Sequence, residues 1–420
     1  MPATRPARPG GPRRILVTST FFPPVAFGGY EVECGGVVDR LREDHEVLVL
    51  TASRGAAEAG QETGVRRTLP LLSPDPRGSL RAPAAALRGA QIAREAMRWC
   101  PDLVYMWNGS DVPQSTLRVL ADSGVPIAVR VCEHWFGRLF SGDQFLRELL
   151  PADRAVGRAA WSVLCRSVNR LPALRLDPLA PIRIAISWNS AAIARMAPAP
   201  SFVTPVLEET LHSVPRWGDV FAGVSRQSPP PTRDVVFVGR VTPYKGVDVA
   251  IDALAALRAL TVPDARLIVI GPEDAGYGDT LRERAAGLGI ADAILWLGAR
   301  SPEETAAQLA GAAALIVPST WDEPFPLVTI EGALARVPIV ASDVGGISEG
   351  MRDEEHALLF ARGDEAGAAR ALSRALTEPA ATEERVNRAY AHAQQYRIKP
   401  YLDAQAEFVR RAYGALTRRR

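Results

Sequence analysis

The stretch ALIVPSTWDEPFPLVTIEGALA, residues 314–335, contains the structural unit that decides the fold. Its first part, 314–319, is a short apolar run of the kind found in strands buried on both faces of a parallel sheet. Its last part, 325–335, reads as a helix, and Pro326 suits the first helical turn because the N–H that proline lacks has no partner there. A strand, a loop and a helix in this order predict one β–α unit of a parallel sheet.

The same alternation of apolar runs and helix-length amphipathic stretches continues on both sides of this unit. Strands are expected at 14–20, 45–53, 102–107, 125–131, 235–240, 266–272, 293–298, 314–319 and 338–343. Such alternation indicates an α/β protein with doubly wound parallel sheets. At 420 residues, the chain is long enough for two domains with separate cores.

The proline-rich segment SRQSPPPTRD, residues 225–234, is the best candidate for a linker between two Rossmann-like domains. The expected organisation is a disordered basic tail over 1–13, a first domain over 14–224, a second domain over 235–397 and a C-terminal helix over 398–420. The last helix is amphipathic and ends in cations that suit its dipole, and we expect it to pack back on the first domain.

Composition excludes several classes of function. A net charge of +2 with 23% charged residues argues against a nucleic-acid partner. The four cysteines form no CxxC pair, so neither a zinc site nor a disulfide framework is expected, and a reducing compartment fits best. No uncharged apolar run approaches the roughly 18 residues of a membrane span. These features predict a cytoplasmic enzyme.

Arginines spread through apolar sequence over residues 138–183 leave two interpretations open. An amphipathic helix there would make weak peripheral contact with an anionic membrane. The favoured alternative is that arginine stems cover a domain surface in an arginine-rich protein.

The loop after the strand at 235–238 is GRVTPYKG, which places Gly239, Arg240, Lys245 and Gly246 at a strand end. Ligands of open α/β sheets bind beyond the carboxyl ends of the strands. Two cations beside glycines that permit close backbone approach suit a diphosphate. The 49 basic residues include only two lysines, Lys245 and Lys399, so a retained lysine favours a specific role. Neither GxGxxG nor a Walker motif occurs in the chain.

Two carboxylates flank the start of the helix expected at 325–335. Glu323 lies in the loop before it and Glu331 lies within it, while the helix N-terminus between them is a ready anion site. A nucleotide sugar has the matching layout of sugar hydroxyls, diphosphate and ribose hydroxyls. Taken alone, Glu323 could lie near the helix start because the helix dipole favours a negative charge there, and Glu331 could be a solvent-exposed residue on the helix surface. Together with Arg240 and Lys245, they favour a ligand site.

Taken in order, four motifs resemble those of the retaining family 4 glycosyltransferases. The motifs are VVFVGRVTPYKGVDVAIDAL (235–254), RLIVIGP (266–272), E-x7-E (323–331) and VASDVGG (340–346), within a resemblance covering about 14–415. The resemblance implies a GT-B fold, with two Rossmann-like doubly wound domains facing a central cleft. The first domain would bind the acceptor and the second a nucleoside-diphosphate sugar. The implied reaction transfers a hexose to a hydroxyl, or less readily an amine, of a small molecule, glycan or lipid.

The resemblance also implies roles for individual residues, with no metal and no cofactor besides the nucleotide sugar as co-substrate. Arg240 and Lys245 would bind the diphosphate and stabilise its departure, Glu323 would bind the transferred sugar and Glu331 the ribose. Further donor contacts would come from Gly28, Gly29, Gly239, Phe325, Pro326, Leu327 and Val328.

The first half departs from the family pattern. VCEHWFG, residues 131–137, has Cys132 and Glu133 where the family often has a His-Asp pair, so His134 is either a substitute catalytic residue or a packed histidine. Trp107, Asn108 and Asp111 are candidate acceptor contacts, together with His134. The alternatives to simple hexosyl transfer are a GT-B relative that couples the donor to a sugar phosphate or cyclitol, and a catalytically silent nucleotide-sugar-binding protein.

Overall fold

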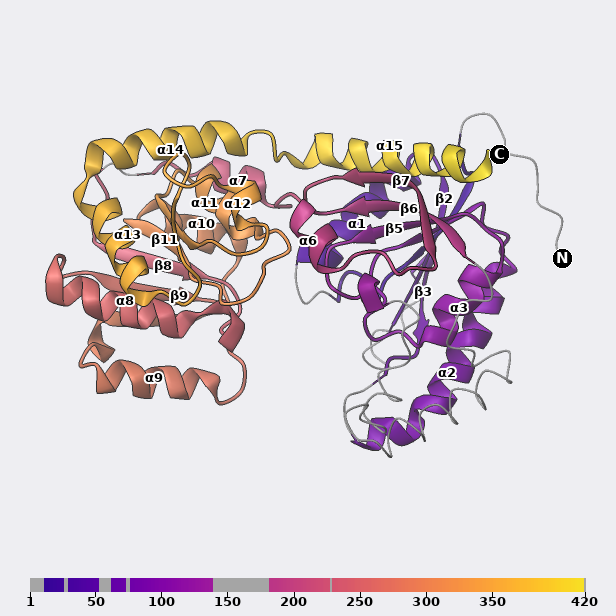
Figure 1. Cartoon of the computed structure of the whole chain (residues 1–420), viewed down its shortest axis with the longest axis horizontal. Coiled ribbons are helices and arrows are strands. Elements are labelled where there is room, and N and C mark those ends of the chain that lie inside the picture. The colour runs from indigo at the N-terminus through magenta and orange to yellow at the C-terminus, as the bar shows by residue number, and fades with distance from the viewer. Residues whose placement is uncertain are drawn as a thin grey trace. The chain divides into compact units, whose positions relative to one another are not determined.

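The computed structural model describes residues 11–25, 29–52, 62–72, 76–138, 181–226 and 229–418, with only the backbone described over 76–83 and at 138. The chain divides into two compact units (Figure 1). The first comprises Met1–Leu211 and Leu402–Arg420, and the second comprises His212–Tyr401. Most of the tail expected over 1–13 lies outside the described residues.

The first unit is built on a seven-stranded parallel sheet with the order β3-β2-β1-β4-β5-β6-β7. Its strands are β1 (Arg14–Thr18), β2 (Glu46–Ala52), β3 (Val65–Leu69), β4 (Leu103–Met106), β5 (Ile127–Val131), β6 (Ile182–Trp188) and β7 (Val203–Thr210). Its helices are α1 (Gly29–Arg42), α2 (Pro76–Met97), α3 (Gln114–Asp122), the short η2 (Phe136–Arg138) and α6 (Ala191–Met196). The central strands are fully buried, as apolar runs between helical layers require.

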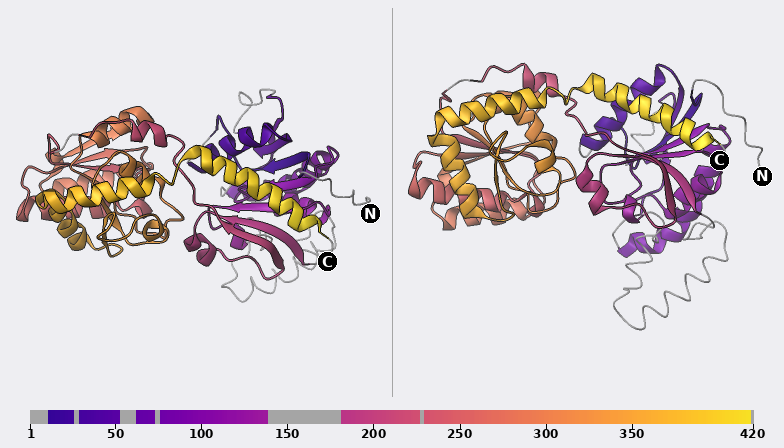
Figure 2. Two further views of the ribbon diagram at one scale, coloured as in Figure 1. Left: turned by 90° about the horizontal axis from the view of Figure 1, so that it is seen from above. Right: turned by 45° about the horizontal axis from the view of Figure 1, so that its top comes forward.

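The last helix, α15 (Ile398–Thr417), contributes its residues from Leu402 onward to the first unit. Figure 2 shows it crossing over the strands of this unit. Phe408 is fully buried beside Tyr105, whose hydroxyl donates to Gln405 Oε1 at 2.8 Å. Arg40 in α1 pairs with Asp403 at 2.7 Å. The apolar face of the C-terminal segment therefore completes the core of a domain that begins almost 400 residues earlier.

The second unit is built on a six-stranded parallel sheet with the order β10-β9-β8-β11-β12-β13. Its strands are β8 (Asp234–Val238), β9 (Arg266–Ile270), β10 (Ile294–Gly298), β11 (Ala314–Val317), β12 (Ile339–Ser342) and β13 (Leu358–Phe360). Its helices are α7 (Gly218–Ala222), η3 (Pro243–Lys245), α8 (Val247–Leu260), α9 (Tyr277–Gly287), η4 (Ala291–Ala293), α10 (Pro302–Ala310), α11 (Leu327–Leu334), α12 (Ile347–Gly350), α13 (Glu365–Thr377) and α14 (Pro379–Ala393).

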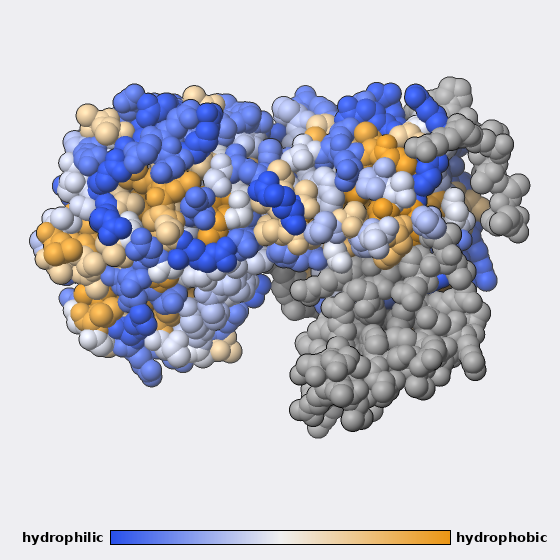
Figure 3. All heavy atoms as spheres, viewed as in Figure 1, coloured by the Kyte–Doolittle hydropathy of each residue, from blue (hydrophilic) through white to orange (hydrophobic). Residues whose placement is uncertain are grey.

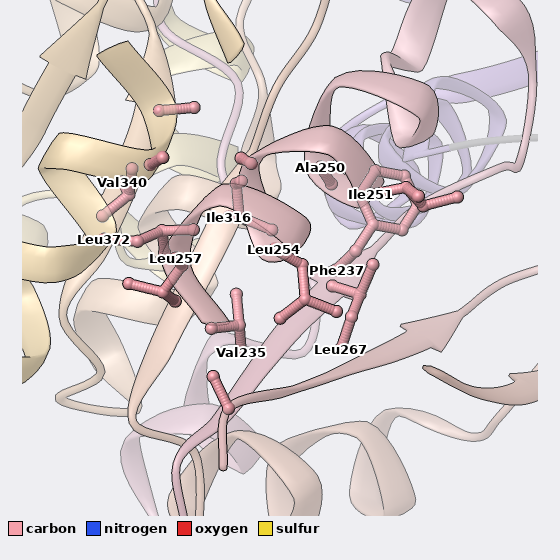
Figure 4. Packing of buried hydrophobic residues seen from close by; sticks show 14 of the residues in the cluster. Val235, Phe237, Ala250, Ile251, Leu254, Leu257, Leu267, Ile316, Val340 and Leu372 are labelled. Atoms are coloured by element: carbon pink, nitrogen blue, oxygen red, sulfur yellow. The ribbon is translucent and has the colours of Figure 1, made fainter. Parts of the chain in front are cut away.

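The core of the second unit forms where α8 covers the sheet (Figure 4). Leu254 and Leu257 from α8 pack with Val235 and Phe237 of β8 and with Ile316 of β11. All five side chains are at most 2% exposed. Burial of this apolar face fixes β8 and β11 side by side, and with them the loops that follow both strands.

The boundary between the units falls at Leu211 and His212, ahead of the predicted linker at 225–234. The difference arises because α7 belongs to the second unit, where it packs against α11. Arg397 pairs with Asp219 of α7 at 2.6 Å. The proline triplet is therefore a connection inside the second unit.

None of the described helices is long and apolar enough to cross a bilayer. On the face drawn in Figure 3, hydrophilic and apolar side chains of the described residues are interspersed. The membrane contact predicted for 138–183 falls almost wholly outside the described residues.

A buried ion pair holds α1 against the sheet of the first unit. Arg130 on β5 is fully buried, and its Nη2 donates to Glu33 Oε1 on α1 at 2.9 Å. Its Nη1 donates to Ser187 Oγ, to the Trp188 carbonyl and to the Leu211 carbonyl at 2.7–3.1 Å. One guanidinium thus ties together a helix, two strands and the end of the domain.

Replacing Arg130 with alanine should lower the free energy of unfolding of the first unit by about 3–5 kcal/mol, because the buried Glu33 carboxylate loses its cation. Urea-induced unfolding followed by tryptophan fluorescence measures this change. The matched control is Asp39→Ala, which removes the exposed partner of Arg42 on the same helix and should leave the free energy almost unchanged. Equal effects of the two substitutions would contradict this role of Arg130.

Candidate functional site

Three loops meet at the carboxyl ends of the neighbouring strands β8, β11 and β12. The loop after β11 is tied to the loop after β8, because the Thr320 N–H donates to the Tyr244 carbonyl at 2.9 Å. It is tied to the loop after β12, because the Gly346 N–H donates to the Glu323 carbonyl at 2.6 Å. The backbone around Glu323 is therefore held from both sides.

Two glycines make this close approach possible. Gly246 has φ of 70°, and a Cβ there would lie 1.9 Å from the Pro318 carbonyl oxygen. Gly345 has φ of 55°, and a Cβ there would lie 2.3 Å from the Glu323 carbonyl oxygen. No L side chain fits either contact, so the spacing of the loops depends on glycine at both positions.

The Glu323 carboxylate lies at the centre of this arrangement and is 3% exposed. Its Oε1 accepts a hydrogen bond from Lys245 Nζ at 2.7 Å and another from Ser319 Oγ. The Ser319 carbonyl in turn accepts from Ser342 Oγ at 2.7 Å. Among the described residues no donor reaches Oε2, so one oxygen is fixed and the other is available to a ligand.

Lys245 is enclosed on the protein side and open on the other. Its ammonium lies 5.9 Å from the centre of the Tyr244 ring and 5.8 Å from that of Trp321, which contact each other edge to face. Its side chain is 26% exposed. Cation–π attraction and the Glu323 carboxylate hold the ammonium in place while part of it faces solvent, as an anion site requires.

Arg240 and Gly239 follow β8 directly and share this edge of the sheet. The Arg240 guanidinium is half exposed and bonds to Asp274 Oδ1 at 3.3 Å. An exposed pair of this kind is weak, so the guanidinium can exchange its partner for a ligand anion at little cost.

The helix α11 begins at this edge at Leu327, two residues later than expected. Pro326 occupies the N-cap position with φ of −78° and ψ of 108°, so the prediction that it lies in the first turn was wrong. Leu327 and Val328 form that turn, and their N–H groups lie at the positive end of the helix dipole.

Glu331 and Phe325 lie in different surroundings. Glu331 is partly exposed, and withdrawal from water raises the pKa of its carboxyl to about 7. No described residue gives it a hydrogen bond.

Phe325 is 6% exposed and packs on His212 and Tyr396 at ring distances of 4.9 and 5.6 Å. Its side chain holds the loop in place, and a ligand contact there would come from its backbone.

In the first unit, the predicted acceptor residues follow β4 and β5. Trp107 is fully buried and packs on Tyr30 and Tyr105, both at 5.6 Å, so packing accounts for its ring. Asn108 is 8% exposed and its Oδ1 caps the turn by accepting from the Ser110 N–H at 2.8 Å. Asp111 is partly exposed, and burial raises the pKa of its carboxyl.

His134 is partly buried and follows β5, next to Glu133 in the sequence. Glu133 was not singled out from the sequence, yet burial and then the charges of Glu31 and Asp111 raise the pKa of its carboxyl, while Asn108 lowers it through a hydrogen bond. Its place directly after a buried strand was the signal that could have found it. Gly29 begins α1, and Gly28 lies outside the described residues.

Comparison with known proteins finds a family match in the second unit. Residues 224–395 match the family described as glycosyl transferases group 1. The second unit therefore belongs to the group 1 glycosyl transferases. This group 1 domain carries Arg240, Lys245, Glu323 and Glu331.

Two curated relatives share the same name and match part of this chain. D-inositol 3-phosphate glycosyltransferase from Stackebrandtia nassauensis is 37% identical over 148 residues, which are 34% of this chain and 33% of the relative. The enzyme of that name from Acidothermus cellulolyticus is 36% identical over 169 residues, or 39% of this chain and 37% of the relative. The chain thus matches these relatives over little more than a third of their length.

Solved structures extend the likeness to both units. HepE from Anabaena, in complex with UDP and glucose, has a TM-score of 0.63 and 19% identity, covering 94% of this chain and 98% of HepE. Sucrose-phosphate synthase from Thermosynechococcus elongatus has a TM-score of 0.70 and 17% identity, covering 96% and 100%. The predicted GT-B class, with two Rossmann-like parallel-sheet domains, is confirmed. Within the described residues, no group of three or more histidine, cysteine or acidic side chains could hold a metal ion.

Gly246→Ala in the group 1 domain should lower its free energy of unfolding by more than about 2 kcal/mol, since the methyl group meets the Pro318 carbonyl in addition to the cost of a left-handed alanine. Gly276→Ala is the matched control, because Gly276 has φ of 80° with nothing within 4 Å of an added Cβ. It should cost about 1–2 kcal/mol. Urea unfolding curves that coincide for the two variants would refute the contact.

Proposed function

We propose that this protein is a retaining glycosyltransferase that moves a hexose from a nucleoside-diphosphate sugar to a hydroxyl group of its acceptor. An amine as the reacting group is the less favoured form of this proposal. The observation that carries it is the Glu323 carboxylate, with one oxygen fixed by Lys245 and Ser319 and the other available to a ligand. The likeness of residues 224–395 to glycosyl transferases supports it.

The parts of a nucleotide sugar match separate features of the group 1 domain. Glu323 Oε2 would accept from a hydroxyl of the transferred sugar. Lys245, Arg240 and the first-turn N–H groups of α11 would bind the diphosphate, whose charge they complement. Glu331, to which no described residue donates a hydrogen bond, would accept hydrogen bonds from the ribose hydroxyls. HepE is reported with UDP and glucose, which favours a donor of this kind.

The reaction breaks the bond between the anomeric carbon and the diphosphate oxygen, and the bonding electrons leave with the phosphate. An acceptor oxygen then bonds to the anomeric carbon on the face that the phosphate left. The acceptor proton passes to the departing phosphate oxygen, or to His134 if that side chain reaches the acceptor. Lys245 and Arg240 stabilise the charge that develops on the leaving group. The nucleotide sugar is the only co-substrate in this scheme.

The name of the curated relatives favours a second candidate for the acceptor, a cyclitol phosphate. The catalytically silent alternative is disfavoured by the intact pairing of Lys245 with Glu323. We place the enzyme in the cytoplasm, consistent with a sequence whose four cysteines form no CxxC pair. Weak membrane contact through 138–183 stays a prediction, which failure of anionic vesicles to retain the protein at low salt would refute.

Nucleotides should stabilise the protein through Lys245. In a thermal-shift panel of UDP, GDP, ADP and dTDP and their hexose conjugates, one nucleotide series should raise the melting temperature by several degrees. At about 100 times the dissociation constant, a ligand adds roughly 2.7 kcal/mol. Lys245→Ala should abolish the shift. Lys399→Ala removes the other lysine, an exposed residue, and should preserve it. A shift retained in Lys245→Ala, or absent for every nucleotide, would refute the donor site.

Donor affinity should fall below neutral pH because of Glu331. Its pKa of about 7 means that the carboxyl is protonated at pH 6 and must lose a proton before it can accept two ribose hydrogen bonds. The dissociation constant for the nucleotide sugar should therefore rise about tenfold from pH 8 to pH 6. Calorimetric titration measures this rise, and Glu331→Gln should flatten the profile. A flat profile in the unaltered protein would show that Glu331 does not bind the donor in its ionised form.

A further inference from the structure

A small cavity lies at the amino edge of the second unit's sheet, opposite the edge that carries Lys245 and Glu323. Its wall includes Ile339 and Leu358, the first residues of β12 and β13, together with residues of α13 and α14. The space in which the centre of a water-sized sphere can lie is about 10 Å³. The cavity therefore admits one water molecule or one monatomic ion, and nothing as large as a phosphate or a sugar.

The wall of this cavity contains one cation and no acid. Arg385 of α14 lines it, and the remaining lining residues are Thr382, His356 and apolar residues. Arg385 is only 7% exposed. A charge withdrawn from water in this way is costly unless an opposite charge or several hydrogen bonds compensate it.

The chain supplies little of that compensation. Among the described residues, Arg385 makes one hydrogen bond and no ion pair. Its Nη2 donates to Thr382 Oγ1 at 3.1 Å, and the Thr382 hydroxyl in turn donates to the Ala375 carbonyl at 3.1 Å. A guanidinium carries five N–H groups, so most of its donors have no partner in the part of the chain that the structure describes. Buried donors in native proteins are almost always satisfied, which points to a bound acceptor.

The acids whose charges act on Arg385 are bonded to another arginine. Glu354 binds Arg374 through both carboxylate oxygens, at 2.6 and 3.0 Å, and Glu378 pairs with Arg374 at 3.5 Å. Burial lowers the pKa of the Arg385 guanidinium and the charge of Arg374 lowers it further, whereas Glu354 and Glu378 raise it. An arginine stays protonated in proteins even so, and the cavity wall keeps its positive charge.

His356 adds no second charge to the wall. Burial, and then the nearby His392, lower the pKa of the His356 imidazole to about 4, so it is neutral at neutral pH. Its Nδ1 accepts from the Arg352 N–H at 3.3 Å, which places the ring hydrogen on Nε2. A Glu355 oxygen lies 3.5 Å from Nε2, a long contact. With Arg385 as the single charge, the wall matches an anion of charge −1.

We propose that this cavity binds a monatomic, monovalent anion, with chloride as its natural occupant, through the Arg385 guanidinium. The size of the cavity excludes phosphates and sugars, and the single positive charge selects an anion over water. The bound ion joins α14 to the amino ends of β12 and β13 and so stabilises the second unit. This inference does not depend on the sugar transfer proposed above.

Chloride should stabilise the full-length protein at constant ionic strength. Exchange of gluconate, which is too large for the cavity, for chloride at about 0.2 M should raise the melting temperature by at least about 2 °C. Arg385→Met should abolish this shift, because it replaces the cation with an apolar side chain. Arg370→Met is the matched control, since Arg370 on α13 is 71% exposed and pairs with Asp364 at 3.6 Å. It should keep the full shift.

Bromide locates the ion directly. It is a monatomic anion of the same charge as chloride, and it scatters X-rays anomalously. Crystals of the unaltered protein soaked in sodium bromide should give an anomalous peak in the cavity beside Arg385. This measurement needs no variant, so it tests the site even if Arg385→Met fails to fold.

The proposal is overturned if the cavity gives no anomalous peak and holds only a water molecule. A melting temperature of the unaltered protein that is the same in chloride and gluconate would also overturn it. So would a chloride shift in Arg385→Met equal to that of the unaltered protein, because the stabilising ion would then bind elsewhere.

Discussion

The pairing of Lys245 with the buried carboxylate of Glu323 is the interaction on which the candidate site depends. A carboxylate that is 3% exposed is costly unless a cation and a hydrogen bond compensate it, and here both compensating donors reach the same oxygen. The second oxygen is held in a fixed orientation, and no donor of the described residues reaches it. The site is thus organised before any ligand arrives, which reduces the cost of ordering it on binding.

The surrounding structure holds Lys245 and Glu323 in position. The apolar contacts of α8 with β8 and β11 set the spacing of the two strand ends. Gly246 allows the loop after β8 to approach the backbone of the loop after β11 closely. Tyr244 and Trp321 limit the movement of the ammonium, and Phe325 anchors the far end of the loop in an aromatic cluster. Each of these groups acts by restricting where Glu323 and Lys245 can lie.

Sequence patterns predicted the buried strands and the donor residues because both carry local signals. Strands covered on two faces are continuous apolar runs, and Lys245 and Glu323 occur in motifs with fixed spacing. The edge strands β3 and β7 were missed because VRRTL and VTPVLEET carry polar residues on the face open to water. Strand β6 was missed because its apolar run IRIAISW borders a segment without clear periodicity. The hydrogen bond of Ser342 to the Ser319 carbonyl and the surroundings of Glu133 join residues that are far apart in the sequence, and spacing along the chain does not encode them.

The position of α15 has a consequence for the order in which the protein is made. The first unit closes its core with residues that follow Leu402, and Phe408 and Gln405 contact a strand that begins at Leu103. During synthesis these residues leave the ribosome only after every strand of the second unit has emerged. The second unit can therefore form its sheet before the first unit receives the helix that completes its core.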